Sequence, residues 1–552
     1  MIFTKEEKAI LENFVTSVED NVYAIKKDVP PEVFGAFGSY FSRNPKDFRE
    51  HLLDAIKGNI EEEQTNVSYK DLEWLIKGDF NDPTSAISKG IAKSQDFFRK
   101  WYGKYSHKSI ANTVWIPIVA TNVSQLFARE LAYEQLAFFI EQSTRYVKWS
   151  LDKIFQDSDL IKDNKKVYLN SLETSVNAYD RLTEIGIEFY KKRNPFNEWL
   201  EKQPDNIKNN PENLKKSSYD RQIRGAALDV ARFLLPQACL TNIAWICDAR
   251  STEFDIASWK GHPLLEIKNI ANLIEKHAGQ IAPSLLKYTE KNPYYEDKLN
   301  NYENIFKSIY PINIFRKSVD IISYDKDALD KTIAHLMKRY NFGGTFRDRY
   351  YEVKLMNFER KIDLLRRITE KRGSYDEWIE TDEDFDLTKI VFEIRTDIGA
   401  IRDWRRHQKW DRGESLYSLD NGYHKPFMIE EMGKEVENLF DKVMETSYEA
   451  EQTIKKNFPY QAQYVLPMAT MHSITMSGGL DNLQYMLWTR TTPQGNFSYR
   501  EDAFKIAEEV VKIHPWLLGY EIYPDKDFME IYLEAPLKNL LRLQTGETDL
   551  HV

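Results

Sequence analysis

Two short segments of the chain hold side chains suited to binding an anion. The first, EQSTRY, places Ser143 and Arg145 two positions apart. A hydroxyl, backbone N–H groups and a guanidinium together offer the charge-assisted hydrogen bonds that a phosphate dianion accepts. The second, RHQKWDRGE, opens with Arg406 and His407 inside a run dense in charge. Each has an ordinary alternative, a helix-end loop for the first and a solvated helix face for the second.

Three more arginines stand beside apolar segments that could hold them in place. They are Arg232 in ARFLLP, Arg250 in DARS and Arg490 in LWTR. The alternatives are internal ion pairs for the first two and an ordinary interface arginine for the third. An anion site needs only a few such groups, even in a protein of net charge −10.

The chain lacks the sequence signs of several other chemistries. Its two cysteines, Cys239 and Cys247, lie in LLPQACLTNIAWIC, where we expect small buried apolar residues. No CxxC pair, Gly-rich phosphate loop, metal-spaced His/Cys cluster or Ser-His-Asp order stands out. Because neither cysteine has a neighbouring base to activate it, we expect no cysteine nucleophile. Because no metal-spaced cluster stands out, we expect no metal site.

An internal repeat indicates which elements position these residues. Residues 231–259 and 462–490 align without a gap at a constant offset of 231 positions (490 minus 259), so that Trp259 matches Arg490. Upstream of each block a strand-like stretch, TVWIPIVA or KIVFEIRT, runs into an amphipathic helix. We therefore predict two homologous halves that share one fold and pack about a pseudo-twofold axis.

Length and periodicity set the domain organisation. A chain of 552 residues is too long for one ordinary core. Helix-like stretches outnumber period-two runs, which predicts an α+β fold with helix in excess of sheet. We place an N-terminal domain at residues 1–300, with a helical insertion near 150–225, and a C-terminal domain at residues 301–552.

The order of the motifs resembles the flavin-dependent thymidylate synthases. That family carries Arg-His-Arg, seven residues and then Ser, within a stretch that ends Glu-x-Ser-x-Arg-Tyr. An Ala-Arg-x-Val-Leu-Pro stretch follows, and then an Asn-x-Arg-Ser segment that leads to an arginine facing the pyrimidine. Each half of this chain follows most of that order, with different losses.

The first half keeps the nucleotide-binding end of the signature. A short run matches Glu-x-Ser-x-Arg, to which the resemblance assigns nucleotide binding: Glu141, Gln142, Ser143, Thr144 and Arg145. Arg232 matches the Ala-Arg arginine, and Arg250 matches the Asn-x-Arg-Ser arginine. In contrast, the residues YEQ at 133–135 replace Arg-His-Arg, and Trp259 replaces the arginine that faces the pyrimidine.

The second half keeps the opposite end. Arg406 and His407 match Arg-His, while Gln408 replaces the last arginine of that triplet. Glu414 falls at the flavin-side glutamate, and Arg490 at the arginine that faces the pyrimidine. Three other positions have lost the nucleotide-binding residue: Leu416, Ser418 and Gln463.

This complementary loss predicts one composite site in a pseudo-dimer, because family active sites lie between subunits. The resemblance adds Arg232 and Arg406 to the nucleotide-binding run. It makes Arg490 the catalytic residue, whose charge would stabilise negative charge developing on the uracil ring. It assigns flavin binding to Arg250, Arg406, His407, Gln408 and Glu414.

The implied activity is flavin-dependent C5 methylation, or a related C5 modification, of a deoxyuridylate-like nucleotide monophosphate. FAD is the implied cofactor, with NADPH and methylenetetrahydrofolate as candidate co-substrates. The residues leave the one-carbon donor, the reductant and the base open. Since YEQ and Gln408 remove family flavin contacts, an alternative is a nucleotide-binding or regulatory pseudoenzyme without flavin chemistry; a third is a purely structural pseudoenzyme.

Composition sets the expected location and partners. An isoelectric point near 5.7 argues against duplex nucleic acid as a partner. The acidic start MIFTKEEKAILENF is unlike a signal peptide, and no run of about 18 apolar residues occurs. We therefore expect a cytoplasmic protein that binds no membrane. A homodimer of fused chains would rebuild the family's four-domain assembly.

Overall fold

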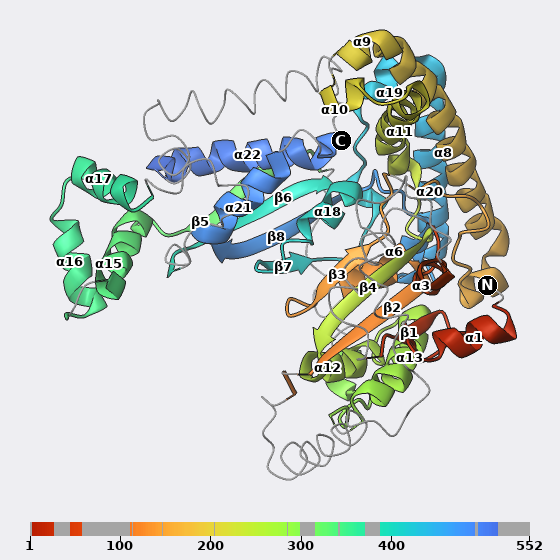
Figure 1. Ribbon diagram of the computed structural model, residues 1–552, viewed down its shortest axis with the longest axis horizontal. Helices are drawn as coiled ribbons and strands as arrows, with labels where there is room; N and C mark the ends of the chain where they lie inside the picture. The colour runs from red at the N-terminus through yellow and green to blue at the C-terminus, as the bar shows by residue number, and fades with distance from the viewer. Residues whose placement is uncertain are drawn as a thin grey trace. The chain divides into compact units, whose positions relative to one another are not determined.

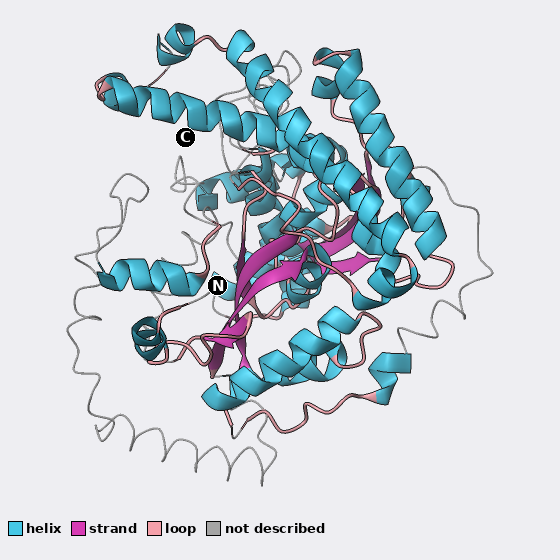
Figure 2. Cartoon of the chain, turned by 90° about the vertical axis from the view of Figure 1, so that its right-hand side faces the viewer, coloured by secondary structure: helices cyan, strands magenta, loops and turns pink. Residues whose placement is uncertain are grey.

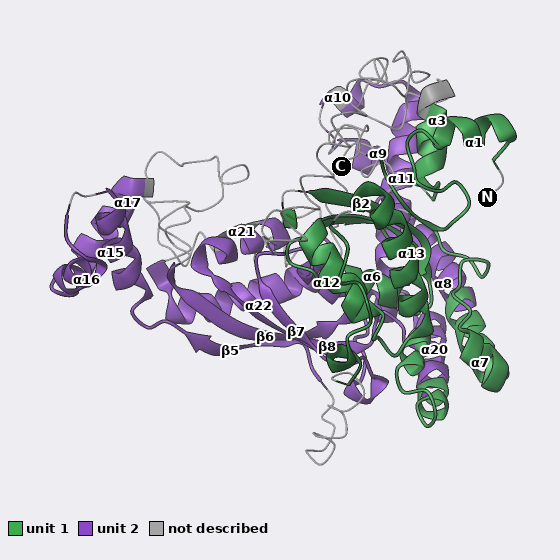
Figure 3. Cartoon of the chain, turned by 90° about the horizontal axis from the view of Figure 1, so that it is seen from below, with its two compact units in different colours: residues 1–176, 235–311, 449–465 green, residues 177–234, 312–448, 466–552 purple. Residues whose placement is uncertain are grey.

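Two compact units make up the fold (Figure 3). The computed structural model describes residues 3–26, 45–57, 111–112, 114–145, 147–201, 203, 205–283, 285–297, 315–340, 343–369, 387–491 and 495–516. Unit 1 comprises residues 1–176, 235–311 and 449–465, and unit 2 comprises residues 177–234, 312–448 and 466–552. Each unit thus includes a segment from the opposite half of the sequence. The boundary predicted at 300 lies outside the described residues and stays a prediction.

The core of unit 1 is built on a four-stranded antiparallel sheet. Its strands are β1 (Val22–Ala24), β2 (Trp115–Ser124), β3 (Phe138–Glu141) and β4 (Leu240–Asp248), in the order β1-β2-β4-β3. Helix α6 (Gln125–Leu131) follows β2 directly, and α12 (Ala249–Trp259) follows β4 directly. Helix α13 (Leu265–Ile281) packs against β1.

The core of unit 2 repeats this sheet. Its strands are β5 (Ser318–Tyr324), β6 (Lys389–Asp397), β7 (Asp411–Glu414) and β8 (Met471–Gly479), in the order β5-β6-β8-β7. Helix α18 (Ile398–Trp404) follows β6, and α21 (Leu480–Thr491) follows β8. Helix α22 (Phe497–Ile513) lies along β5 and β6 (Figure 1).

The strand register agrees with the sequence alignment of the halves. Glu141 of β3 pairs with Ile243, and Glu414 of β7 pairs with Ile474. These two partners are 231 positions apart (474 minus 243), the offset of the sequence repeat. The two glutamates of the signature therefore occupy equivalent places in the two sheets. The predicted pseudo-twofold axis itself stays a prediction.

Local chemistry explains why a helix begins directly after β2 and after β6. Ser124 ends β2, and its Oγ accepts the N–H of Phe127 at 3.1 Å. Asp397 ends β6, and its Oδ1 accepts the N–H of Ala400 at 2.8 Å. Such side-chain caps satisfy donors that the first helical turn leaves unpaired. The segment after each cap, which carries the signature, is therefore placed at the end of its sheet.

Helices make up most of the remaining described chain (Figure 2). The α+β class with helix in excess of sheet is therefore confirmed. Among the described residues, no helix is long and apolar enough to cross a membrane. The other α-helices are α1 (Lys5–Leu11), α3 (Phe48–Lys57), α7 (Ser158–Asp163), α8 (Lys165–Arg193), α9 (Phe196–Glu201), α10 (Asp205–Lys208), α11 (Glu212–Ala231), α15 (Ala328–Tyr340), α16 (Phe346–Lys354), α17 (Phe358–Thr369), α19 (Phe427–Glu431) and α20 (Lys434–Ile454).

Candidate functional site

A cluster of arginines surrounds one buried carboxylate in unit 2. Asp403, near the end of α18, has a side chain only 12% exposed. Its Oδ1 lies 3.6 Å from Nε of Arg406 and 3.9 Å from Nη1 of Arg490, and its Oδ2 lies 3.9 Å from Nη2 of Arg232. Burial alone would raise the pKa of Asp403. The positive charges of four guanidinium groups outweigh burial and lower that pKa. These groups belong to Arg406, Arg490, Arg232 and Arg402.

Different elements of unit 2 bring these arginines together. Arg232 caps the C-terminus of α11, and its Nη2 also donates to the carbonyl of Gly399 at 3.3 Å. Arg490 comes from the last turn of α21, and Arg406 follows the end of α18. An arginine from the first half of the sequence thus joins two from the second half inside one unit. Four guanidinium groups face one carboxylate, so the cluster suits an anion.

His407 is bonded to one of these arginines. Nε of Arg490 donates to Nε2 of His407 at 2.7 Å, and both residues are buried. Burial lowers the pKa of His407 well below its ordinary value, and the charges of Arg490, Arg406 and Arg412 lower it further. The imidazole is therefore neutral and acts as an acceptor. The guanidinium of Arg490 also lies 5.2 Å from the centre of the Tyr499 ring.

Glu414 forms a buried ion pair. Nε and Nη2 of Arg405 lie 2.8 and 2.5 Å from its two carboxylate oxygens. The side chain of Glu414 has no exposed surface, and Nη2 of Arg405 also donates to the Tyr417 hydroxyl. Although burial opposes it, Glu414 and then Tyr417 raise the pKa of Arg405. This pair joins the end of α18 to β7 and so fixes the backbone on either side of His407.

Of the residues predicted from the first half of the sequence, all except Arg232 lie in unit 1. Glu141 ends β3, and the loop after it contains the buried side chains of Gln142 and Thr144. In this loop the Oγ of Ser143 accepts the N–H of Arg145 at 3.2 Å, and both side chains are half-buried. Arg250 is an exposed residue in the first turn of α12.

The equivalent positions of unit 1 have a different charge. Gln463 stands where the repeat places Arg232, and its Oε1 accepts from Nη1 of Arg129 at 3.4 Å. Nε of Arg129 lies 3.8 Å from Oε1 of Glu130. Trp259, the counterpart of Arg490, packs against aromatic rings of its own unit, with centroid distances of 6.2 and 6.0 Å. Of the four described residues of unit 1 named here, Gln463, Arg129, Glu130 and Trp259, only Arg129 is an arginine.

Comparison with known proteins gives the family. Residues 58–284 and 327–516 match the family described as thymidylate synthase complementing protein, Thy1. The chain belongs to this family. The two matched regions fall on the two halves of the repeat, so the resemblance of each half is confirmed.

Several relatives cover most of the chain. A UPF0159 protein of Chlamydia muridarum is 25% identical over 93% of this chain and 94% of its own. A UPF0159 protein of Thermoplasma acidophilum is 25% identical over 77% and 88%. A flavin-dependent thymidylate synthase of Clostridium tetani is 26% identical over 34% of this chain and 66% of its own. The solved UMP/dUMP methylase PolB of Streptomyces cacaoi, bound to 5-Br dUMP, is 16% identical over 37% and 93%, with a TM-score of 0.28.

Sequence reasoning missed the residues that organise the cluster of this Thy1 protein. Asp403 and Arg405 belong to the charge-dense run DWRRHQKWDR, for which a solvated helix face was the alternative. That interpretation fits Arg406, whose side chain is 46% exposed, but the other two residues are buried. The available signal was the pair of tryptophans in this run, Trp404 and Trp410, both of which are fully buried.

The expectation for the two cysteines is confirmed, since Cys239 and Cys247 are both buried and do not form a disulfide. Burial raises the pKa of the Cys247 thiol, and the charges of Asp255 and Asp248 raise it further. That thiol is therefore protonated at neutral pH and is not an activated nucleophile.

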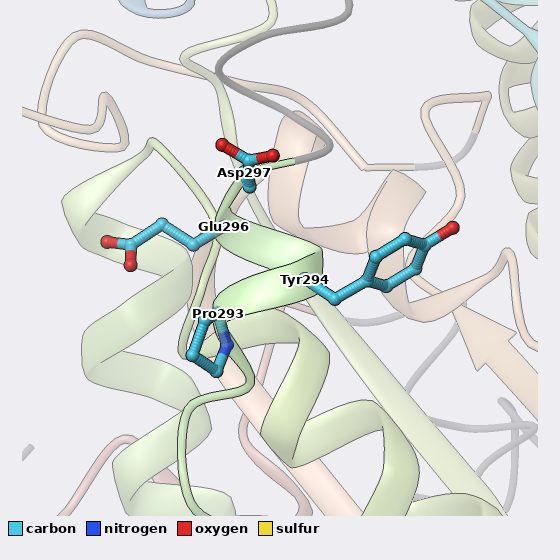
Figure 4. Close-up of a pocket in the computed structure, with 4 residues that line it drawn as sticks. All are labelled: Pro293, Tyr294, Glu296 and Asp297. Carbon is cyan, nitrogen blue, oxygen red and sulfur yellow. The ribbon is translucent and has the colours of Figure 1, made fainter.

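A surface hollow of about 550 Å³ in unit 1 has none of the predicted residues in its lining. It is lined by Pro293, Tyr294, Glu296 and Asp297 (Figure 4). The side chains of Tyr294 and Glu296 point in different directions from a short helical turn, so they do not converge on a common point. This hollow offers no arrangement for the family's chemistry.

Proposed function

We propose that this protein modifies C5 of a deoxyuridylate-like nucleotide monophosphate, as a flavin-dependent methylating enzyme of the Thy1 family. The arginine cluster around Asp403 carries the proposal. It gathers Arg232, Arg406 and Arg490, the residues to which the family resemblance gives nucleotide recognition. Family membership and the flavin-dependent thymidylate synthase relative support the same reaction class.

The cluster suits the two tasks that such a reaction sets. A nucleotide monophosphate is a dianion, and guanidinium groups held in a buried site bind it through strong charge-assisted hydrogen bonds. Asp403 offsets only part of the charge of the surrounding guanidinium groups, so the cluster keeps an excess of positive charge. An anionic ligand can therefore bind without displacing Asp403. Arg490, buried and held by His407, would stabilise negative charge developing on the ring.

Flavin supplies the redox chemistry of the family when it is bound. In this chain the residues fit it in part. Arg406, with its side chain 46% exposed, and the half-buried Gln408 would hold a flavin nucleotide through its anionic and polar groups. Glu414 does not fit the predicted contact, because both of its oxygens already bind Arg405.

We propose further that each chain has one such site and that the loop at Ser143 and Arg145 supplies the second anchor for the phosphate. The support is the complementary loss of motifs between the halves. The charge of unit 1 agrees, since Gln463 and Trp259 stand there in place of Arg232 and Arg490. Assembly of two chains as a homodimer belongs to the same proposal.

The buried ion pair of Glu414 favours a second candidate function, a nucleotide-binding pseudoenzyme without flavin. Absorbance and mass spectrometry of the purified protein decide between the two. Bound flavin supports the enzyme, while bound nucleotide in a colourless protein supports the pseudoenzyme.

Equivalent substitutions in the two units test nucleotide recognition. Arg232→Gln gives unit 2 the residue that unit 1 already has, and Gln463→Ala is the matched control. We expect Arg232→Gln to weaken dUMP binding about 10- to 100-fold in calorimetry, since a hydrogen bond to a charged group contributes about 1.5–3 kcal/mol. The control should bind as the unchanged protein does. Equal affinities for all three proteins would refute the proposed site.

A further inference from the structure

The Arg490 guanidinium has a fixed orientation in the cluster. Its Nε hydrogen is directed at Nε2 of His407, 2.7 Å away, while Nη1 lies 3.9 Å from Oδ1 of Asp403. The Tyr499 ring lies 5.2 Å from Cζ. With Nε used in this way, the edge formed by Nη1 and Nη2 is the one available for two parallel hydrogen bonds to a planar ligand.

The hydrogen bond also fixes the proton on His407. Arginine has donors only, so Nε2 must accept and therefore carries no hydrogen. The proton of the neutral imidazole is then on Nδ1. This tautomer is the reverse of one that would offer Nε2–H to a bound ring.

Charge around His407 maintains this arrangement. The groups that face it are Arg490 on α21, Arg406 beside it and Arg412 on β7, and all three disfavour a second positive charge. Trp404 of α18 lies against the imidazole, with ring centroids 6.2 Å apart. Burial acts in the same direction, so the acceptor form persists throughout the neutral pH range.

We propose that His407 is a positioning residue, which aims the Nη1–Nη2 edge of Arg490 at the substrate ring, and that it does not bind the cofactor. This inference rests on the proposed function of the cluster. It changes the role that the family resemblance gives to His407, because the Nε2 atom is already used. The partner that orients Arg490 is neutral. The positive charge of Arg490 is therefore not neutralised by the contact that holds it.

Two substitutions separate positioning from cofactor binding. Gln in place of His407 keeps an acceptor oxygen at a similar reach, whereas Leu keeps only bulk. We expect His407→Leu to lower kcat/KM for dUMP about 100-fold, mainly through kcat, because a misplaced group loses transition-state interactions. His407→Gln should recover activity to within about tenfold of the unchanged protein. Both variants should retain the flavin content of the unchanged protein.

A spectroscopic measurement is independent of turnover. In ¹⁵N-histidine-labelled protein, the His407 signals, identified by their loss in His407→Gln, should show protonated Nδ1 and unprotonated Nε2 at pH 7. Protonated Nε2, or equal loss of flavin in both variants, would overturn the inference. If the unchanged protein binds neither nucleotide nor flavin, the proposed function fails, while the tautomer still decides whether His407 orients Arg490.

Discussion

Ser124 and Asp397 cap equivalent helices, and each takes part in a hydrogen bond between a hydroxyl and a carboxylate. Ser124 is the donor in one unit, and Asp397 is the acceptor in the other. The Ser124 hydroxyl donates to Oε2 of Glu266 at 2.6 Å, whereas Asp397 accepts from the hydroxyl of Ser498. Glu266 and Ser498 are themselves equivalent, as second residues of α13 and α22. The carboxylate and the hydroxyl have thus exchanged places between the units. In each unit this contact ties a later helix, α13 or α22, to the end of the second strand.

The exchange predicts opposite pH dependences of stability. Burial raises the pKa of Glu266, although hydrogen bonds from Ser124 and Tyr464 oppose it. The native state therefore holds this proton to higher pH than the unfolded chain does, and stability is lost as pH rises above about 4.3 through the raised pKa. Relative to the unchanged protein, Glu266→Gln should gain stability with rising pH in urea titrations between pH 4 and 8. A gain with falling pH would contradict this assignment.

The second carboxylate behaves in the reverse way. Burial opposes ionisation of Asp397, but Lys317, at 3.4 Å, and His424, at 2.9 Å, lower its pKa below the ordinary value. Its contribution to stability is therefore present above about pH 3.9 and is lost as pH falls through the lowered pKa. Asp397→Asn should cost about 3 kcal/mol at pH 7, with a smaller deficit toward pH 3. A deficit independent of pH would show that Asp397 is not ionised.

Two adjacent arginines should separate stability from binding. Arg405→Met breaks a buried ion pair with Glu414 and should lower the free energy of unfolding by about 3–5 kcal/mol. Arg406→Met removes a largely exposed side chain and should change unfolding by less than about 0.5 kcal/mol. When dUMP binding is measured on folded protein, Arg406→Met should bind dUMP more weakly than Arg405→Met does. Equal unfolding free energies for the two variants would contradict the buried pair.

Arg490→Ala should nearly abolish turnover while leaving part of nucleotide binding. In the proposed site its charge would act on the ring, and the phosphate would keep its other guanidinium partners. We expect kcat to fall about 100- to 1,000-fold, the range for loss of one group that stabilises a developing anion. Steady-state kinetics and calorimetry with dUMP are the measurements. An equal loss in Kd and kcat/KM, with kcat unchanged, would assign Arg490 to uniform binding instead.

The proposed phosphate anchor in the loop of unit 1 has a counterpart in unit 2 that serves as a matched control. Arg145→Ala removes the arginine of the signature, and Ser418→Ala changes its counterpart in unit 2. Loss of the arginine should weaken dUMP binding by about 2 kcal/mol. The second change should have little effect, because Ser418 caps a short 3₁₀ helix with its Oγ on the N–H of Asp420. Comparable losses at both positions would refute a single site per chain.

The sequence by itself determined the repeat, the α+β class and the family. A fixed offset, the alternation in KIVFEIRTD and the order of several motifs are features of the sequence itself. They can therefore be recognised without knowledge of how the chain packs. The same features placed Arg232, Arg406 and Arg490 among the site residues. They could not show that Glu414 would be enclosed by Arg405, because that contact depends on how β7 returns beside α18.

Only the tertiary structure decided which charges meet. Asp403 and Arg405 looked like part of a solvated run, since sequence periodicity does not tell a charged face in water from one covered by other elements. Arg232 comes from the first half but lies in unit 2, because the segment 177–234 packs with residues from the second half. Long-range packing set the protonation of His407 and Asp403 as well. Burial and neighbouring guanidinium groups are properties of the folded surroundings and not of the residue types.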